Sequence, residues 1–453
     1  MTSPALDSHN ILKHFGGLAS NDLSQILQTR DEISYEGEDT YYCNSNYYDI
    51  EGMSEFLLSN KDKLSILSLN IQSLNAKFDN LNLILRELQN KELEFSFICL
   101  QETWLTKDSD TSIFEIENYN SFHQGSSCSK HGGLVIYAHN SFTSIKFNPL
   151  NTFSTWEGMF LEIPLSIGKH LLIMNMYRPP KQNNNNAILT TFLEEFLPTL
   201  TKVNNYKAET IITGDFNIDL LKLTNREKFQ EFFDLLTSSD FIPLITLPTR
   251  FSTHTATLID QIYCKHSNSL PIPQSGILYS NISDHFATFS CLNHKLSLKP
   301  KNTRYVNITT NTPETRTNFS NELLNINWEN VFCHGPDADP NNSYENFLNT
   351  IESLRAKHFP TKRVKFNKYL HKKNKWISLG ILRSLHFRDK LYHKVKQTSQ
   401  TDNQYLTLKH NLKIYNSILN KLIRTAKQKP EYIYDYLWPR NGEALAGLPA
   451  IDW

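Results

Sequence analysis

Five short clusters of acidic and amide residues each follow or end an apolar run of strand length. They are Asn70, Gln101-Glu102-Thr103, Gly214-Asp215-Phe216-Asn217, Ile259-Asp260 and Ser283-Asp284-His285. Oxygen ligands of this kind are those that hard divalent cations take, and a His beside a carboxylate can hold a proton near neutral pH. Strands that end at one rim of a sheet would bring the clusters together. The sequence therefore predicts a metal-assisted site for hydrolysis of a phosphate ester.

Glu102 and Asn70 are the predicted metal ligands. Glu102 follows the apolar run 95–100, and Asn70 ends the run before it, so a strand-helix-strand unit would place both at the same rim. Mg²⁺ keeps several water ligands, so one or two carboxylates with an amide beside them suffice. Mn²⁺ is the alternative ion. The competing interpretation of Glu102 is an ordinary surface carboxylate after a strand.

Asp215 and Asn217 are predicted to handle water and phosphate. Gly214 permits a tight turn at the end of a strand. Asp215 can then hold or deprotonate the attacking water, and Asn217 can donate to the phosphate. A Gly-Asp pair is also common in plain turns, and that interpretation stays open.

Asp260 and His285 form the second predicted pair. A His held and charged by a carboxylate can stabilise the pentavalent phosphate or assist proton transfer.

Three further candidates would contact phosphate. Tyr177 and Arg178 follow the apolar run 171–176 and offer a hydroxyl and a charged fork, while Thr249 is a weaker candidate. A turn with a packed tyrosine is the alternative for Tyr177.

The elements that position these residues are mostly strands. Apolar runs predict strands at 64–69, 95–100, 134–137, 159–163, 171–176, 210–213, 259–264 and 287–291, and helical spacing predicts helices at 76–88, 188–200 and 226–236. The helix from 188 is expected to end near Pro198. Strands outnumber helices, which favours an α/β fold with a sheet-on-sheet core flanked by helices.

Composition divides the chain into five segments. Residues 1–60 are predicted to be a polar, largely disordered leader with at most a short helix at 23–27, and residues 61–294 the catalytic domain. A linker is expected at 295–354, a basic helical region at 355–430 and a tail at 431–453. Within the basic region, two amphipathic patterns, 376–395 and 405–422, predict helices that pair on their apolar faces.

Charge is balanced over the whole chain, with 46 Lys or Arg and 46 Asp or Glu. From residue 355 to 429, however, 20 Lys or Arg face only two Asp, which indicates a polyanionic partner. A solvated helix face is the alternative.

Six scattered Cys favour reduced thiols, and the absence of a secretory signal or membrane span in the sequence favours an intracellular protein with no membrane partner.

Seven phrases together resemble the endonuclease/exonuclease/phosphatase superfamily, and among its members the endonuclease domain of non-LTR, LINE-type retrotransposons of the jockey or CR1-like groups. The phrases are Leu69-Asn70-Ile71, Gln101-Glu102-Thr103-Trp104, Gly132-Gly133-Leu134, Tyr177-Arg178-Pro179-Pro180, Gly214-Asp215-Phe216-Asn217, Leu258-Ile259-Asp260-Gln261-Ile262 and Ser283-Asp284-His285. The resemblance covers about half of the chain.

The resemblance implies a four-layer α/β sandwich, in which two packed sheets lie between helices. It implies that Glu102, Asn70 and Asp284 bind or approach Mg²⁺, that Asp215, Asn217 and Tyr177 act on water and phosphate, and that Asp260 orients His285. The implied activity is nicking of one strand of duplex DNA, in the nucleus, so that the 3′-hydroxyl primes reverse transcription. The basic region 355–430 is then expected to contact DNA or element RNA.

The chain departs from such elements after residue 295. A reverse transcriptase needs an Asp-Asp pair for two metals, and this sequence contains no adjacent Asp pair. We therefore expect a fragment or truncated copy without reverse transcriptase activity. Two alternatives remain: a phosphatase of the same fold that acts on a phosphomonoester, and a decayed element product that only binds nucleic acid.

Overall fold

The computed structural model describes residues 45–126, 130–150, 153–166, 169–180, 186–206, 208–252, 255–265, 271–295, 305–309, 312–332, 339–365, 376–398 and 402–428. These residues form two units, one from the residues up to 295 together with those from 376 onward, the other from residues 305–365. The predicted short helix at 23–27 and the tail 431–453 lie outside the described residues. Within the described part, none of the helices has the length and apolarity that crossing a membrane requires.

The first sheet of the larger unit has seven strands. In spatial order they are β1 (Tyr47–Tyr48), β14 (Gln274–Leu278), β15 (Ala287–Lys295), β2 (Lys63–Asn70), β3 (Phe97–Gln101), β5 (Leu134–His139) and β4 (Tyr119–Gln124). β2 and β3 are parallel, and Asn70 lies opposite Gln101. The two strands therefore deliver Asn70 and the loop that carries Glu102 to the same rim.

The second sheet has six strands. Their order is β10 (Phe241–Pro243), β13 (Asp260–Lys265), β9 (Glu209–Asp215), β8 (Lys169–Tyr177), β7 (Glu157–Ser166) and β6 (Lys146–Pro149). The parallel pair β8 and β9 places Tyr177 opposite Asp215, and the antiparallel strand β13 places Asp260 on the other side of Asp215. Three of the predicted site residues thus end at one rim of this sheet.

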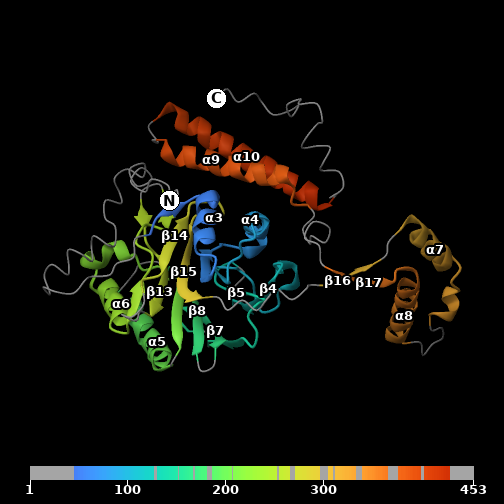
Figure 1. The fold of residues 1–453 in the computed structure, drawn as a ribbon, viewed down its shortest axis with the longest axis horizontal. Helices are drawn as coiled ribbons and strands as arrows, with labels where there is room; N and C mark the ends of the chain where they lie inside the picture. The colour runs from blue at the N-terminus through green and yellow to red at the C-terminus, as the bar shows by residue number, and fades with distance from the viewer. Residues whose placement is uncertain are drawn as a thin grey trace. The chain divides into compact units, whose positions relative to one another are not determined.

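The sheets pack face to face between two layers of helices (Figure 1). Along β2, Leu64 and Ile66 face the core between the sheets, while Leu67 and Leu69 face the helix α4, as the alternation of a strand requires. The helices of the first sheet are α3 (Ile50–Ser59) and α4 (Leu74–Asn90), and those of the second are α5 (Asn186–Asn205) and α6 (Glu227–Thr237). The predicted four-layer α/β sandwich is confirmed.

Short elements complete the sandwich. They are the two-stranded ribbon β11 (Arg250–Phe251) and β12 (Ala256–Thr257), and the 3₁₀ turns η1 (Ser112–Phe114) and η2 (Leu220–Asn225).

Two boundaries differ from the predicted ones. Order begins before residue 61, because β1 pairs with β14 and the Tyr47 hydroxyl donates to the Pro248 carbonyl oxygen at 2.8 Å. The polar composition around these residues concealed the buried side chains of Tyr47 and Met53. Helix α5 also continues through Pro198 to Asn205, since the apolar residues Leu200 and Val203 keep their places in the core.

The smaller unit occupies most of the segment predicted as a linker. β16 (Tyr305–Thr309) and β17 (Thr361–Lys365) form an antiparallel pair, and between them lie α7 (Pro313–Leu324), η3 (Trp328–Asn330) and α8 (Pro340–His358). Thr312 and Asp339 cap the helices, and a Pro follows each cap at a position that suits it. Because α8 spans the expected boundary at residue 354, the linker and the basic region are not separate pieces.

Two long helices follow in the larger unit, α9 (Leu379–Gln397) and α10 (Asn403–Gln428). They pack on each other as an antiparallel hairpin, with the rings of Phe387 and Tyr415 5.2 Å apart. This agrees with the two predicted amphipathic helices. The sequence did not predict that Leu385 and Ile423 would also enter the apolar cluster of α4.

Candidate active site

Asn70 connects the two sheets at the centre of the site. Its Nδ2 donates to Glu102 Oε1 and to Asp215 Oδ2, each at 2.8 Å. Glu102 follows a strand of the first sheet and Asp215 ends a strand of the second, so the Asn70 amide bridges the two sheets and reaches Asp215, 145 residues along the chain. The predicted clusters that contain Glu102 and Asp215 therefore meet at Asn70, which is the third cluster.

The loop after β3 aims Glu102 into the site. Glu102 and Trp104 have positive φ angles of 50° and 59°, which are costly for residues other than glycine and concentrate at functional sites. Backbone bonds from Thr103 and Trp104 to the carbonyl oxygens of Gly133 and Gly132 hold this shape. The Trp104 indole then donates to Glu102 Oε2 at 3.2 Å. The carboxylate is oriented from both sides.

Gly214 brings Asp215 into place. Its φ is +147°, and a Cβ there would lie 1.8 Å from the carbonyl oxygen of Met176 on the neighbouring strand. Asp215 is fully buried, and burial together with the charge of Asp260 raises its pKa to about 7. Asn217 donates to Asp215 Oδ2 at 3.1 Å and to the Arg178 carbonyl oxygen at 2.7 Å. The Asn217 amide was predicted to donate to phosphate. In the structure it donates to Asp215 and orients that carboxylate.

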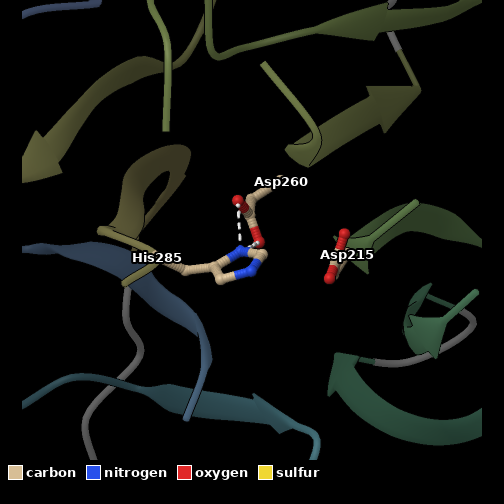
Figure 2. A group of neighbouring side chains, drawn as sticks. All are labelled: Asp215, Asp260 and His285. Carbon is tan, nitrogen blue, oxygen red and sulfur yellow. Dashed lines mark hydrogen bonds and ion pairs between the residues drawn. The ribbon is translucent and has the colours of Figure 1, made fainter. Parts of the chain in front are cut away.

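Asp260 holds His285. The ring Nδ1 lies 2.9 Å from both carboxylate oxygens of Asp260, and Asp215 faces the pair from β9 (Figure 2). Burial alone would lower the pKa of His285, but the charges of Asp260, Asp215 and Asp284 outweigh burial and raise it to about 9. The imidazole is thus a cation at neutral pH, held in one orientation.

Thr249 supports Asp260 from the opposite side. Its hydroxyl donates to Asp260 Oδ2 at 2.6 Å and accepts from the Asp260 backbone N–H at 3.2 Å. Phe286 donates its N–H to the Thr249 carbonyl oxygen at 2.8 Å, which ties the His285 loop to the same place. Thr249 is fully buried. It is positioned to align the pair rather than to touch a substrate.

Asp215, Asp260 and His285 offer ligand atoms that all lie within 4.8 Å of one another. Proximity alone would make them a metal site, but charge argues against it. The His285 nitrogen that faces Asp260 is already bonded, and the protonated ring repels a second cation. We interpret the three as an ion-paired group rather than a metal site.

Glu102 is better suited to a divalent cation. Among the described residues no Lys or Arg forms an ion pair with it, and its carboxylate accepts from Asn70, from Trp104 and from the Tyr177 hydroxyl. An unpaired, half-buried carboxylate beside an amide is the oxygen donor set that Mg²⁺ or Mn²⁺ takes. These residues fit the ion that the sequence predicted.

Asp284 lies on the far side of His285, with 42% of its side chain exposed. Arg250 donates to its Oδ2 from Nε at 3.1 Å and from Nη2 at 2.9 Å. Burial would raise the pKa of Asp284, but the charges of His285 and Arg250 lower it, so the group is ionised. Its Oδ1 lies 4.0 Å from His285 Nε2.

Tyr177 and Arg178 differ in what they can reach. Burial and the neighbouring charge of Glu102 raise the pKa of Tyr177, so its hydroxyl stays protonated and able to donate. Arg178 is only 1% exposed, and its Nη1 donates to the carbonyl oxygens of Phe216 and Asn217 at 3.2 Å each. That position favours support of the Asp215 loop over the predicted contact with phosphate.

Several residues beneath and beside the site were missed in the sequence. Gln101 Nε2 donates to Asn175 Oδ1 at 2.6 Å across the two sheets, and Asn175 Nδ2 donates to the Leu100 carbonyl oxygen at 3.0 Å. Asn175 interrupts an apolar run, and that interruption was the available signal. Lys77 was also missed; its charge interacts with both Asp284 and Glu102. Arg250 stands directly after Thr249 but was not considered.

Comparison with known proteins bears on the same residues. Residues 67–285 match the model of the Endonuclease/Exonuclease/phosphatase family. No curated protein matches the chain in sequence.

Solved structures similar to this chain include an AP endonuclease from Archaeoglobus fulgidus, at 16% identity and a TM-score of 0.40, covering 51% of this chain and 100% of that one. The catalytic domain of Xenopus laevis APE2 is 19% identical, with a TM-score of 0.39 and coverage of 50% and 91%. The endonuclease domain of TRAS1, a telomere-specific non-LTR retrotransposon, is 12% identical, with a TM-score of 0.37 and coverage of 51% and 99%.

The segment that matches the family model begins in β2 and ends at His285, so it contains every predicted site residue. This part of the chain has the endonuclease/exonuclease/phosphatase fold.

Proposed function

We propose that this chain is a metal-dependent phosphodiesterase that cuts one strand of duplex DNA. The observation that carries the proposal is the network in which Asn70 joins Glu102 to Asp215, beside the ion pair of Asp260 and His285. The family match over residues 67–285 supports a hydrolase of this class.

Glu102 and Asn70 would hold the divalent cation, with Asp284 as a further ligand through Oδ1, since Arg250 occupies only Oδ2. When bound, a Mg²⁺ ion supplies charge neutralisation at the phosphate oxygens. Lys77 adds a positive charge near both carboxylates, which favours an anionic substrate there.

Side chains of the protein accept the proton of the attacking water and stabilise the negative charge that develops on the phosphate. Asp215, with its raised pKa, accepts a proton from the attacking water at neutral pH, and Asn217 keeps its carboxylate in line. His285 carries a positive charge next to the developing negative charge, and Asp260 and Thr249 hold it there. The Tyr177 hydroxyl donates to a phosphate oxygen.

We further propose that the nick serves the insertion of a non-LTR retrotransposon, where the released 3′-hydroxyl primes reverse transcription. This proposal is supported by two sequence motifs around the site, Gln101-Glu102-Thr103-Trp104 and Leu258-Ile259-Asp260-Gln261. Such a chain acts on chromosomal DNA in the nucleus.

A plasmid assay tests the activity. Purified chain is incubated with supercoiled plasmid and Mg²⁺, and we expect a relaxed product that EDTA prevents. Asp215→Asn and His285→Ala should remove it, and both preparations control for a contaminating nuclease. Relaxation that persists in either variant, or its absence in the wild type, contradicts the proposal. Phosphate release from a phosphomonoester without nicking would select a phosphatase instead.

A further inference from the structure

The hairpin of α9 and α10 is fixed to the catalytic sandwich. Polar contacts run from it to α4: His386 Nε2 to Glu87 Oε1 at 2.7 Å, Arg388 Nη1 to Asn80 Oδ1 at 3.0 Å, and Lys427 Nζ to Asp79 Oδ1 at 2.6 Å. Apolar residues of both hairpin helices enter the cluster that contains the leucines of α4. The hairpin is therefore part of the catalytic unit.

One end of the hairpin lies beside the active-site loop. His393, in the last turns of α9, has its Nε2 3.0 Å from the Tyr279 carbonyl oxygen, and their rings are 4.2 Å apart. Tyr279 in turn packs edge-on against Phe286, at 4.7 Å, directly after His285. Lys396, one turn beyond His393, interacts electrostatically with Asp284 and with Lys409 of α10. The loop end of the hairpin thus faces the side of the site that Asp284 occupies.

This end of the hairpin is strongly basic. The two helices contain ten Lys or Arg, and their one acidic residue, Asp389, is buried against Arg388. Toward the loop end the exposed lysines include Lys394, Lys409 and Lys413. A solvated helix face would show such lysines at any place on the protein. Here the charge of Lys409 interacts with that of Lys396, which in turn interacts with Asp284 at the site.

We propose that Lys394, Lys409 and Lys413, at the loop end of the hairpin, bind backbone phosphates of duplex DNA next to the scissile bond. The inference rests on the proposed function and adds a second contact region to it. Lysine is suited to this task because it meets phosphates as a point charge without reading bases. Duplex DNA is favoured over element RNA as the occupant, because this end of the hairpin contacts Tyr279, which packs on Phe286 directly after His285.

Salt dependence of binding tests the proposal. The triple variant Lys394→Ala, Lys409→Ala and Lys413→Ala is made in the Asp215→Asn background, which prevents cutting. Its affinity for a labelled duplex is measured by fluorescence anisotropy over a range of salt concentrations. Each lost phosphate contact should reduce the slope of log K against log salt by about 0.9, so three contacts reduce it by about 2.7. Affinity at low salt should fall as well.

A matched control removes the same number of charges elsewhere. Lys61, Lys91 and Lys202 are exposed and lie where β2, β3 and β9 begin, at the rim opposite the site. Their triple Ala variant should bind the duplex with an unchanged slope. Equal slopes in the two triple variants would overturn the inference.

The remaining outcomes separate the two proposals. If the wild-type chain nicks plasmid while the hairpin variant keeps its slope on duplex DNA, the inference fails and the proposed function stands. If the hairpin variant loses affinity for single-stranded RNA only, the inference also fails, since the lysines then serve a different nucleic acid. If wild-type chain does not nick plasmid, the proposed function fails first.

Discussion

Replacing Asp260 by Asn should slow nicking at neutral pH while it leaves the fold intact. Asp260→Asn keeps the shape of the side chain and removes the charge that holds His285 protonated. His285 is 2% exposed, and although burial lowers its pKa, Asp260 together with Asp215 and Asp284 raises it to about 9. Without the charge of that carboxylate the pKa of His285 should fall toward 6.5, the ordinary value for a histidine. At neutral pH the imidazole then changes from charged to largely neutral.

The magnitude follows from the size of that fall. At pH 7 a ring with a pKa of about 9 is almost fully protonated, whereas a ring with a pKa near 6.5 is only about one quarter protonated. If the charged ring is the active form, the nicking rate at pH 7 should therefore fall by about four-fold. The loss should shrink at mildly acidic pH, where the ring of the variant becomes protonated again.

Nicking rates of both proteins across neutral and mildly acidic pH check this reasoning. Glu117→Gln is the matched control, because Glu117 is a buried carboxylate paired with Arg86 near the start of β3, away from the site. It should lower stability without changing the pH profile. The reasoning is refuted if Asp260→Asn cuts at the wild-type rate at neutral pH, or if its loss does not diminish as pH falls.

Three further outcomes are expected. Gly214→Ala should lower the melting temperature and abolish nicking, because its Cβ would collide with the Met176 carbonyl oxygen; a variant that melts and cuts like wild type contradicts this. Glu102→Gln should need a higher Mg²⁺ concentration for half-maximal nicking, as one charge of the metal site is lost; an unchanged titration would exclude Glu102 as a ligand. The hydrogen bond between His386 and Glu87 raises the pKa of His386, so the bond stabilises the fold fully below pH 6.5 and less as pH rises through the raised pKa. The melting temperatures of wild type and His386→Gln should therefore converge at alkaline pH. A difference that stays constant with pH would argue against this contribution.

The arrangement of the site was predictable because strand ends carry positional information. Asn70, Asp215 and Tyr177 each end an apolar run, and parallel strands in register bring such ends to one rim. The ion pair of Asp260 and His285 was predictable for a different reason, since a buried His needs a partner and Asp260 begins a strand of the same sheet.

Other features could not be predicted because they depend on tertiary contacts. The bond between Gln101 and Asn175 joins residues 74 apart, and nothing local to either residue indicates the other. The sequence predicts a phosphate contact for Arg178, but in the structure this side chain is buried under the Asp215 loop. An amphipathic pattern in α9 and α10 shows that each helix has an apolar side, but it does not say which surface that side will cover.

The amide of Asn70 has a consequence for how this chain is made in a cell. Its two acceptors come from opposite halves of the sandwich, and β14 and β15, which complete the first sheet, follow all strands of the second sheet in the chain, so a nascent polypeptide cannot assemble this centre before residue 295 has been made. A slip of one half past the other by a single residue would separate the carboxylates in the same way. The proposed activity therefore requires both sheets to be present and packed in register.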